Sequence, residues 1–345
     1  MNTQNGPLLS VRDLKTYFMM DEGGVKAVDG VSFDVHAGQI FGIVGESGCG
    51  KSVTVKSVLR IVEAPGKIVH GQILLRRPHQ DGTSGEEELD LAGLDAHGPE
   101  IRAIRGEQIA LIPQEPMTSF SPVHTIGNQI IETIMLHQSI DKQAARNLAR
   151  DLLKDVGVPM PDRRLDEYSW QLSGGLRQRA IIAMALSCNP RLLIADEPTT
   201  AVDVTTQAQV LRLLRQLQQE RNSAIIFITH DLGVIAQMAS YVMVMYLGLV
   251  MEQGPVDAIF HAPKHPYTQA LLRSIPSVRS QPRVSLPTIS GSIPHPFNKP
   301  SGCPFHPRCI KNMPGRCEVR TPALQTVGEQ QQVSCFLYHD VEVSA

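Results

Sequence analysis

Eight residues, Gly45–Ser52, constrain the fold more than any other part of this chain. They read Gly-Glu-Ser-Gly-Cys-Gly-Lys-Ser and match the G-x-x-x-x-G-K-[ST] phosphate loop at every fixed position. The apolar run 40–44 predicts a buried strand before the loop, and the apolar spacing in 53–59 predicts a helix after it. Glycines let main-chain N–H groups curl toward phosphate oxygens at a helix N-terminus that favours anions. The segment therefore predicts a nucleoside triphosphate site in an α/β fold.

Two side chains of the loop carry charge or metal chemistry. Lys51 supplies a point charge for the β- and γ-phosphates, and the Ser52 hydroxyl is placed to ligate Mg²⁺. The remaining loop residues and the first residue beyond them are expected to line the nucleotide. The full set is Gly45, Glu46, Ser47, Gly48, Cys49, Gly50, Lys51, Ser52 and Val53.

Composition limits the classes of protein that remain. With 345 residues and 42% hydrophobic residues, the chain can form one large or two moderate domains with a substantial core. A formal charge of −2 gives no signature of nucleic-acid binding. No run of 18 apolar residues predicts a membrane span, and the first residues lack a signal-peptide pattern. We therefore expect a cytoplasmic protein.

A second site is predicted where a buried strand ends in two carboxylates. Residues 192–195 are apolar, and Asp196 and Glu197 follow directly. Ligands of parallel α/β sheets bind at this end of the strands. Asp196 would then belong to the Mg²⁺ shell, and Glu197 would orient or deprotonate an attacking water. For these residues alone a solvated acidic turn is an equal alternative, but a phosphate loop in the same chain favours the catalytic interpretation.

Other segments supply further candidates. Ser173, Gly174 and Gly175 precede a helix and offer a cap with open N–H groups for an anion. Tyr17 or Phe18 could stack on a nucleobase, although a buried aromatic of a small sheet is the alternative. Expected strands cover 8–11, 31–35, 71–75, 109–113 (ending at Gln114) and 224–228 (followed by His230), and expected helices cover 125–156, 180–186 and 204–220. The polar stretch 76–85 is expected to be a surface loop.

Taken together, these motifs resemble the ATP-binding subunits of ABC transporters. The phosphate loop, Gln114, Leu172–Gly175, Ile194–Glu197, Ala201–Asp203 and His230 occur in that family's order. The similarity is greatest to the oligopeptide, dipeptide and nickel importer branch. The resemblance implies a P-loop NTPase core over 8–255, with an N-terminal antiparallel β subdomain, a helical subdomain at about 115–187, and a loop-rich appendage over 256–345.

The resemblance also implies a mechanism and a set of roles. Two cassettes would close head to tail, with ATP between the phosphate loop of one and Ser173–Gly175 of the other. Glu197 would be the catalytic base, His230 would contact the γ-phosphate, and Gln114 would sense Mg²⁺. Asp203 would communicate across the dimer, and Phe18 would stack on adenine. Mg²⁺ would be held by Ser52, Gln114 and Asp196.

Four cysteines gather near the C-terminus with the spacing Cys303-x5-Cys309-x7-Cys317-x17-Cys335. In a reducing compartment they favour a metal over disulfides. Zinc sites usually use close cysteine pairs, which are missing here, so a [4Fe–4S] cluster is the preferred hypothesis, as in some relatives of this branch. Zn²⁺ and unligated core thiols are the alternatives.

The expected partners follow from the same resemblance. An ATPase without a membrane span needs two permease subunits, a second ATPase subunit (itself or a sister chain) and an extracytoplasmic solute-binding protein. We expect it on the cytoplasmic face of the membrane, importing di- or oligopeptides. Nickel, glutathione and oligosaccharide are alternative cargoes. A non-transport ABC ATPase and a regulatory subunit with a dead site are further alternatives, the second opposed by intact Lys51, Glu197 and His230.

Overall fold

The computed structural model describes residues 6–21, 23–79, 85–115, 119–200, 203–274, 289 and 291–339. They form two compact units. The phosphate-loop unit contains 9–34, 41–92 and the described residues after 228, and the carboxylate unit contains those up to 8, 35–40 and 93–228. Some of the residues discussed above lie outside the described ranges: 80–84 of the polar stretch, 116–118 of the expected helical subdomain, 201–202 of the motif Ala201–Asp203, and 275–288, 290 and 340–345 of the expected appendage.

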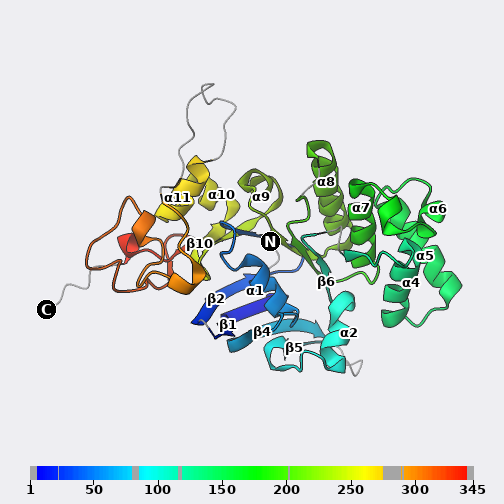
Figure 1. Ribbon diagram of the computed structural model, residues 1–345, viewed down its shortest axis with the longest axis horizontal. Helices are drawn as coiled ribbons and strands as arrows, with labels where there is room; N and C mark the ends of the chain where they lie inside the picture. Colours follow the sequence, from blue (N-terminus) through cyan, green and yellow to red (C-terminus); the bar gives the residue numbers. More distant parts are fainter. Residues whose placement is uncertain are drawn as a thin grey trace. The chain divides into compact units, whose positions relative to one another are not determined.

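An antiparallel sheet with the order β2-β1-β4-β5 forms one part of the phosphate-loop unit (Figure 1). Leu9, Val11 and Leu14 of β1 are fully buried, so this strand contributes directly to the core. The strands are β1 (Leu9–Met20), β2 (Gly23–Val35), β4 (Gly66–Pro78) and β5 (Glu86–Asp90).

The prediction of a surface loop from Arg76 is wrong at its start. Arg76 and Arg77 belong to β4 and lie opposite Glu88 and Glu87 of β5. Arg77 Nε donates to Glu87 Oε1 over 2.7 Å. Cross-strand pairs of opposite charge stabilise a sheet, so the charged residues extend the strand instead of ending it.

A second group of strands in this unit includes β3, the strand that leads into the phosphate loop. β3 (Ile40–Val44) pairs parallel with β9 (Tyr241–Tyr246), and β10 (Leu249–Pro255) pairs antiparallel with β9 and with β12 (Gln332–Val333). β12 also pairs with β11 (Gln325–Thr326). Every residue of β3 is buried, as expected for a parallel strand covered on both faces.

The helices of the phosphate-loop unit include two in the C-terminal appendage, the residues from 256 onward. We expected this region to be loop-rich. Pro266 stands at the first position of α11, where its missing N–H costs nothing, and His265 caps that helix by accepting from Tyr267 N–H. The helices are α1 (Lys51–Val58), α9 (Leu232–Met238), α10 (Val256–His261) and α11 (Pro266–Arg273).

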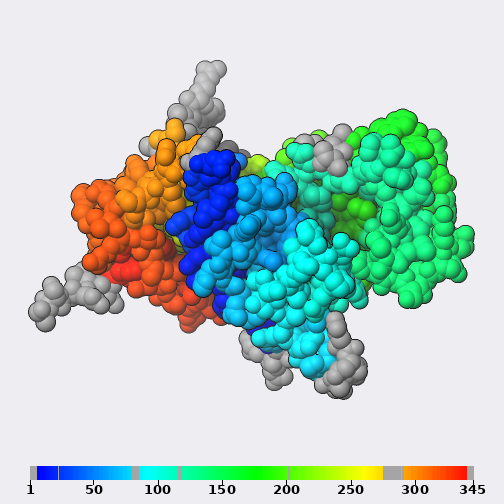
Figure 2. Space-filling model, turned by 60° about the horizontal axis from the view of Figure 1, so that its bottom comes forward, coloured from blue at the N-terminus to red at the C-terminus, as the bar shows by residue number. Residues whose placement is uncertain are grey.

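Figure 2 shows appendage residues in orange beside the blue N-terminal strands. Lys299 makes this contact specific, because its ammonium lies 3.0 Å from the Asp29 carboxylate of β2. The appendage therefore packs on the phosphate-loop unit and belongs to the same compact body.

The carboxylate unit is built on three parallel strands, β6 (Ile109–Ile112), β7 (Leu192–Asp196) and β8 (Ala224–Ile228). α4 to α7 gather in one bundle of this unit (Figure 1). The helix expected over 125–156 is two helices, because Gln138, the C-cap of α4, adopts an extended conformation. The helices are α2 (Pro99–Glu107), α4 (Ile126–His137), α5 (Lys142–Asp155), α6 (Pro161–Leu165), α7 (Gly174–Ala185) and α8 (Val204–Arg221). Within the described ranges, no helix combines the length and apolar character needed to cross a bilayer.

Candidate functional site

The phosphate loop leaves the end of β3 and enters α1 through Gly50. Gly50 is the N-cap of α1 and has φ 101°, a left-handed conformation that favours glycine. A Cβ at this position would collide with the Ala27 carbonyl oxygen. Gly48 also has a positive φ of 76°, but an added Cβ there would meet nothing within 4 Å. The loop is thus tightly packed at Gly50, where it enters α1, and open at Gly48.

Lys51 places its ammonium inside this loop. Lys51 Nζ donates to the carbonyl oxygens of Gly45 over 2.8 Å and of Glu46 over 3.1 Å, and only 6% of the residue is exposed. Cys49 is also buried, and burial raises the pKa of its thiol. Ser47 and Gly48 are exposed, whereas Ser52 and Val53 are half-buried in the first turn of α1. The loop has the form and the cation that a bound triphosphate requires.

Glu46 of the loop is held by the C-terminal appendage, a contact that no pattern in the sequence predicts. Its main-chain N–H donates to the Tyr267 hydroxyl over 3.0 Å. Its carboxylate accepts two hydrogen bonds from Arg308, over 2.7 and 3.0 Å. Tyr267 and Arg308 stand 221 and 262 residues away in the sequence, so no local signal could have found them.

Tyr17 and Phe18, the two candidates for stacking on a base, are consecutive on β1 and therefore point to opposite faces. The Tyr17 hydroxyl donates to Asp29 over 2.7 Å, and burial with this contact raises the Tyr17 pKa. Phe18 lies opposite Gly66 on β4, and a Cβ on Gly66 would come within 2.6 Å of the ring. Phe18 is half-buried and has no polar group to satisfy.

His230 is exposed and lies just before α9. Its neighbour Asp231 caps that helix, with Oδ1 accepting from Gly233 N–H over 2.8 Å. Thr229 is buried, with 3% of its surface exposed. The histidine therefore stands on a fixed backbone with its side chain accessible.

In the carboxylate unit, two predicted residues meet directly. Gln114 follows β6, Glu197 follows β7, and these strands are parallel neighbours. Gln114 Nε2 lies 3.4 Å from Glu197 Oε2, which also accepts from the Thr200 hydroxyl over 3.0 Å. Glu197 has a positive φ of 47°, unusual for a residue other than glycine. Asp196 is 5% exposed at the end of β7. Both carboxylates thus lie where the sequence predicted.

The Ser-Gly-Gly segment starts α7 as expected. The Ser173 hydroxyl accepts from Leu176 N–H over 3.4 Å, and a Cβ on Gly174 would meet nothing within 4 Å. The buried Gln178 Nε2 donates to the Pro198 carbonyl over 2.7 Å, which joins α7 to the turn after Glu197. Sequence reasoning missed this contact.

Asp203 caps α8. Its two carboxylate oxygens accept from Thr206 N–H over 3.0 Å and from the Thr206 hydroxyl over 2.6 Å. These hydrogen bonds lower the Asp203 pKa. A role for Asp203 across a dimer remains a prediction, because both hydrogen bonds lie within its own helix.

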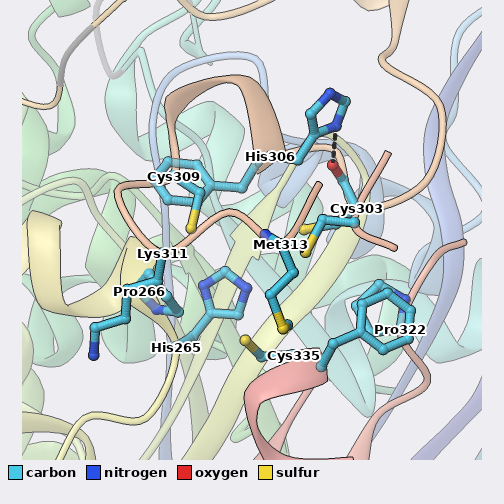
Figure 3. A pocket seen from close by; sticks show the side chains of 12 residues that line it. His265, Pro266, Cys303, His306, Cys309, Lys311, Met313, Pro322 and Cys335 are labelled. Atoms are coloured by element: carbon cyan, nitrogen blue, oxygen red, sulfur yellow. Dashed lines mark hydrogen bonds between the residues drawn. The ribbon is translucent and has the colours of Figure 1, made fainter. Parts of the chain in front are cut away.

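The four C-terminal cysteines line one cavity, together with His265 and Phe305 (Figure 3). Burial raises the pKa of Cys303 to about 12 and of Cys335 to about 11, and neighbouring cysteines add to both shifts. Across the described ranges, no group of three or more His, Cys, Asp or Glu side chains is already arranged to hold a metal ion.

Each histidine near these cysteines has one ring nitrogen in contact with the main chain. His306 Nδ1 lies 2.9 Å from the Cys303 carbonyl oxygen, as Figure 3 shows. His339 Nε2 lies 3.1 Å from the Ala323 carbonyl oxygen, and His265 Nδ1 accepts from Tyr267 N–H. The four cysteines, which all line this cavity, are the candidate ligands that their spacing predicts.

Comparison with protein families gives two matches. The family described as "ABC transporter" matches residues 28–200, and "Oligopeptide/dipeptide transporter, C-terminal region" matches residues 251–317. The chain is 46% identical over 334 residues to the oligopeptide transport ATP-binding protein AppD of Bacillus subtilis, covering 96% of this chain and 97% of the relative. It is 44% identical over 331 residues to the dipeptide transport ATP-binding protein DppD of Escherichia coli, covering 95% and 96%.

Solved structures show the same fold. The dimeric cassette MJ0796, a bacterial ABC transporter cassette, superposes with a TM-score of 0.61 at 24% identity, covering 72% of this chain and 98% of that one. The protein cbiO1 of Clostridium perfringens gives 0.59 at 24% identity, covering 75% and 92%. These similarities confirm the fold expected from the sequence.

Proposed function

The chain belongs to the family of ABC transporter ATP-binding proteins, and from this premise we propose that it hydrolyses ATP to drive peptide import through separate membrane subunits. The observation that carries the proposal is the similarity to oligopeptide and dipeptide transport ATP-binding proteins over at least 95% of the chain. The match of residues 251–317 to the C-terminal region of peptide transporters supports the same cargo class.

The chemistry assigned to the phosphate-loop unit is binding. The loop amides and Lys51 would hold the triphosphate, with Lys51 leaving the carbonyls of Gly45 and Glu46 for the β- and γ-phosphates. Phe18 would stack on adenine, since its ring is apolar and half-buried while Tyr17 is bonded to Asp29. His230, exposed on a fixed backbone, would contact the γ-phosphate.

The chemistry assigned to the carboxylate unit is hydrolysis. Glu197 would take the proton of the attacking water. Gln114, whose Nε2 lies 3.4 Å from the Glu197 carboxylate, would orient that carboxylate. Asp196, Ser52 and Gln114 offer the hard oxygen ligands that Mg²⁺ prefers. When bound, Mg²⁺ neutralises charge that develops on the phosphates. Ser173, Gly174, Gly175 and Asp203 would complete the ATP site of a second ATPase subunit.

The proposed assembly contains two permease subunits, a second ATPase subunit and an extracytoplasmic solute-binding protein, with this chain on the cytoplasmic face of the membrane. The test is ATP-driven uptake of labelled di- and oligopeptides into vesicles that contain the assembled transporter. We expect uptake with the parent chain and none with Lys51→Ala. Peptide uptake that proceeds equally with Lys51→Ala would overturn the proposal.

We further propose that Cys303, Cys309, Cys317 and Cys335 hold a [4Fe–4S] cluster with a structural role. The proposal rests on the cysteine spacing, which lacks the close pairs usual for zinc, and on the one cavity that all four cysteines line. The raised pKa values of Cys303 and Cys335 mean that binding must release protons. Iron and zinc analysis of anaerobically purified protein, with its absorption spectrum, tests this. Colourless, iron-free protein would exclude the cluster.

A further inference from the structure

Arg308 connects the cysteine-bearing appendage to the phosphate loop. Its guanidinium donates to both carboxylate oxygens of Glu46, over 2.7 and 3.0 Å. The Arg308 side chain is only 5% exposed and that of Glu46 20%. Two-point arginine–carboxylate pairs removed from water are geometrically specific and strong. This contact therefore fixes where Glu46 lies.

Aromatic residues hold Arg308 in place. Arg308 also donates to the Tyr246 hydroxyl over 3.2 Å. The rings of Tyr246, Tyr267 and Phe305 pack together with centroids 4.8 to 5.5 Å apart. Tyr267, through its hydroxyl, accepts from the Glu46 N–H. Both the main chain and the side chain of Glu46 are thus bound by groups that share one packed cluster.

The turn formed by residues 303–309, the cysteine turn, determines the position of Arg308. Arg308 lies between Cys303 and Cys309, and its N–H donates to the Phe305 carbonyl over 3.0 Å. Cys303 N–H donates to the Cys317 carbonyl over 2.8 Å, so the main chain at Cys317 holds the start of this turn. A change in the fold of the cysteine turn would therefore displace the guanidinium.

Glu46 matters to the nucleotide for an electrostatic reason. It is the second residue of the phosphate loop, and a bare carboxylate there would repel a triphosphate. Arg308 neutralises that charge. Glu46 is also one of the two residues whose carbonyl oxygens bind Lys51, so a shift of Glu46 would disturb the phosphate-binding cation as well.

We propose that Arg308 is a positioning residue of the ATP site, which neutralises and orients Glu46 so that the appendage sets the ATP affinity of the phosphate loop. The proposal depends on the proposed function only in that the chain binds ATP. In this proposal the appendage controls the affinity of the phosphate loop for the nucleotide, in addition to forming a structural region.

The test is a double-mutant cycle in the full chain assembled with its permease partners, with KM for ATP and kcat measured separately. Arg308→Gln leaves Glu46 charged and should raise KM about tenfold, the size expected for loss of a charge-assisted contact, with kcat within about twofold. Raising the salt concentration should reduce this defect. Arg308→Lys keeps the charge without the two-point geometry and should raise KM about threefold.

The double variant distinguishes positioning from folding. Glu46→Gln with Arg308→Gln removes both charges and should return KM to within about threefold of the parent. Arg316→Gln is the matched control, because Arg316 lies in the same appendage with its guanidinium over the Phe336 ring at 4.8 Å. We expect no change in KM from that control.

Three results would overturn the proposal: an unchanged KM in Arg308→Gln, a double variant as impaired as Arg308→Gln alone, or an equal defect in Arg316→Gln. If Arg308→Gln does not fold, the KM values of Arg308→Lys and of the double variant are compared with that of the parent instead. A parent chain that fails to bind ATP would instead refute the proposed function, so the two failures are distinguishable.

Discussion

The phosphate loop and the cysteine appendage lie in the same compact unit but are held in different ways. Apart from Glu46, which Tyr267 and Arg308 bind, the loop is held by contacts of its own between a buried strand and a helix. These are the left-handed Gly50 cap and the carbonyls that bind Lys51. The appendage is held by side chains, through the ring cluster around Phe305 and the four cysteines around their cavity.

This difference indicates how each region should fail when it is altered. The residues proposed to act on ATP lie on or beside regular strands and helices, so changing one should remove chemistry and leave the fold intact. In the described part of the appendage after α11, regular structure is limited to two-residue strands and three-residue helical turns, so changing one side chain should loosen this part.

The largest expected effect is a loss of ATP turnover in a variant that still folds and binds ATP. Glu197→Gln keeps the shape of the side chain but cannot accept a proton, so turnover should fall at least about 100-fold while ATP stays bound. Phosphate release and equilibrium ATP binding measure the two quantities. Glu220→Gln on the exposed face of α8 is the control. Hydrolysis at the parent rate by Glu197→Gln would show that Glu197 is not the base.

The next effect tests whether the appendage depends on its thiols. Cys303→Ser removes one of four candidate ligands, and iron content should fall about tenfold or more, with easier proteolysis of the appendage. Cys188→Ser is the control, since this cysteine is half-buried in the carboxylate unit. Equal iron content in both variants would contradict a cluster at these four cysteines.

A smaller effect tests the ring cluster. Phe305→Leu retains apolar volume but removes ring contacts with Tyr246 and Tyr267, and should lower the local free energy of opening by about 1–2 kcal/mol. Amide hydrogen exchange in residues 303–338 measures this quantity. Phe297→Leu, which loses a ring stacked on His295, should change it less. An unchanged exchange rate in Phe305→Leu would mean that the rings do not hold the appendage.

The smallest effect concerns Asp203, which caps a helix and is also proposed to complete the ATP site of a second subunit. Asp203→Ala removes the N-cap of α8 and should lower the free energy of unfolding by about 1 kcal/mol. Asp141→Ala removes a similar cap from α5, where the carboxylate accepts from Ala144 N–H over 2.8 Å, and should cost the same. Only Asp203→Ala should also slow ATP hydrolysis. Equal turnover in the two variants would leave Asp203 as a cap alone.

The predictions that succeeded rest on signals within a few residues. The strand 224–228 was predicted with its observed bounds, and the carboxylates lie at the end of β7 as expected, Asp196 as its last residue and Glu197 directly after it. Two of the features that the sequence did not predict depend on distant partners. Arg76 and Arg77 extend a strand because glutamates of the next strand pair with them. Arg308 and Tyr267 reach Glu46 across more than 200 residues, and no spacing rule anticipates such a contact.

The buried bond between Gln178 and Pro198 has a mechanical consequence. An amide that is 0% exposed cannot exchange this partner for water without cost, so α7 and the turn beyond Glu197 must travel together. A tilt of α7 would therefore displace the backbone next to the proposed catalytic carboxylate. A protein that docks on this unit and rotates α7 would change the rate of hydrolysis without itself contacting the nucleotide.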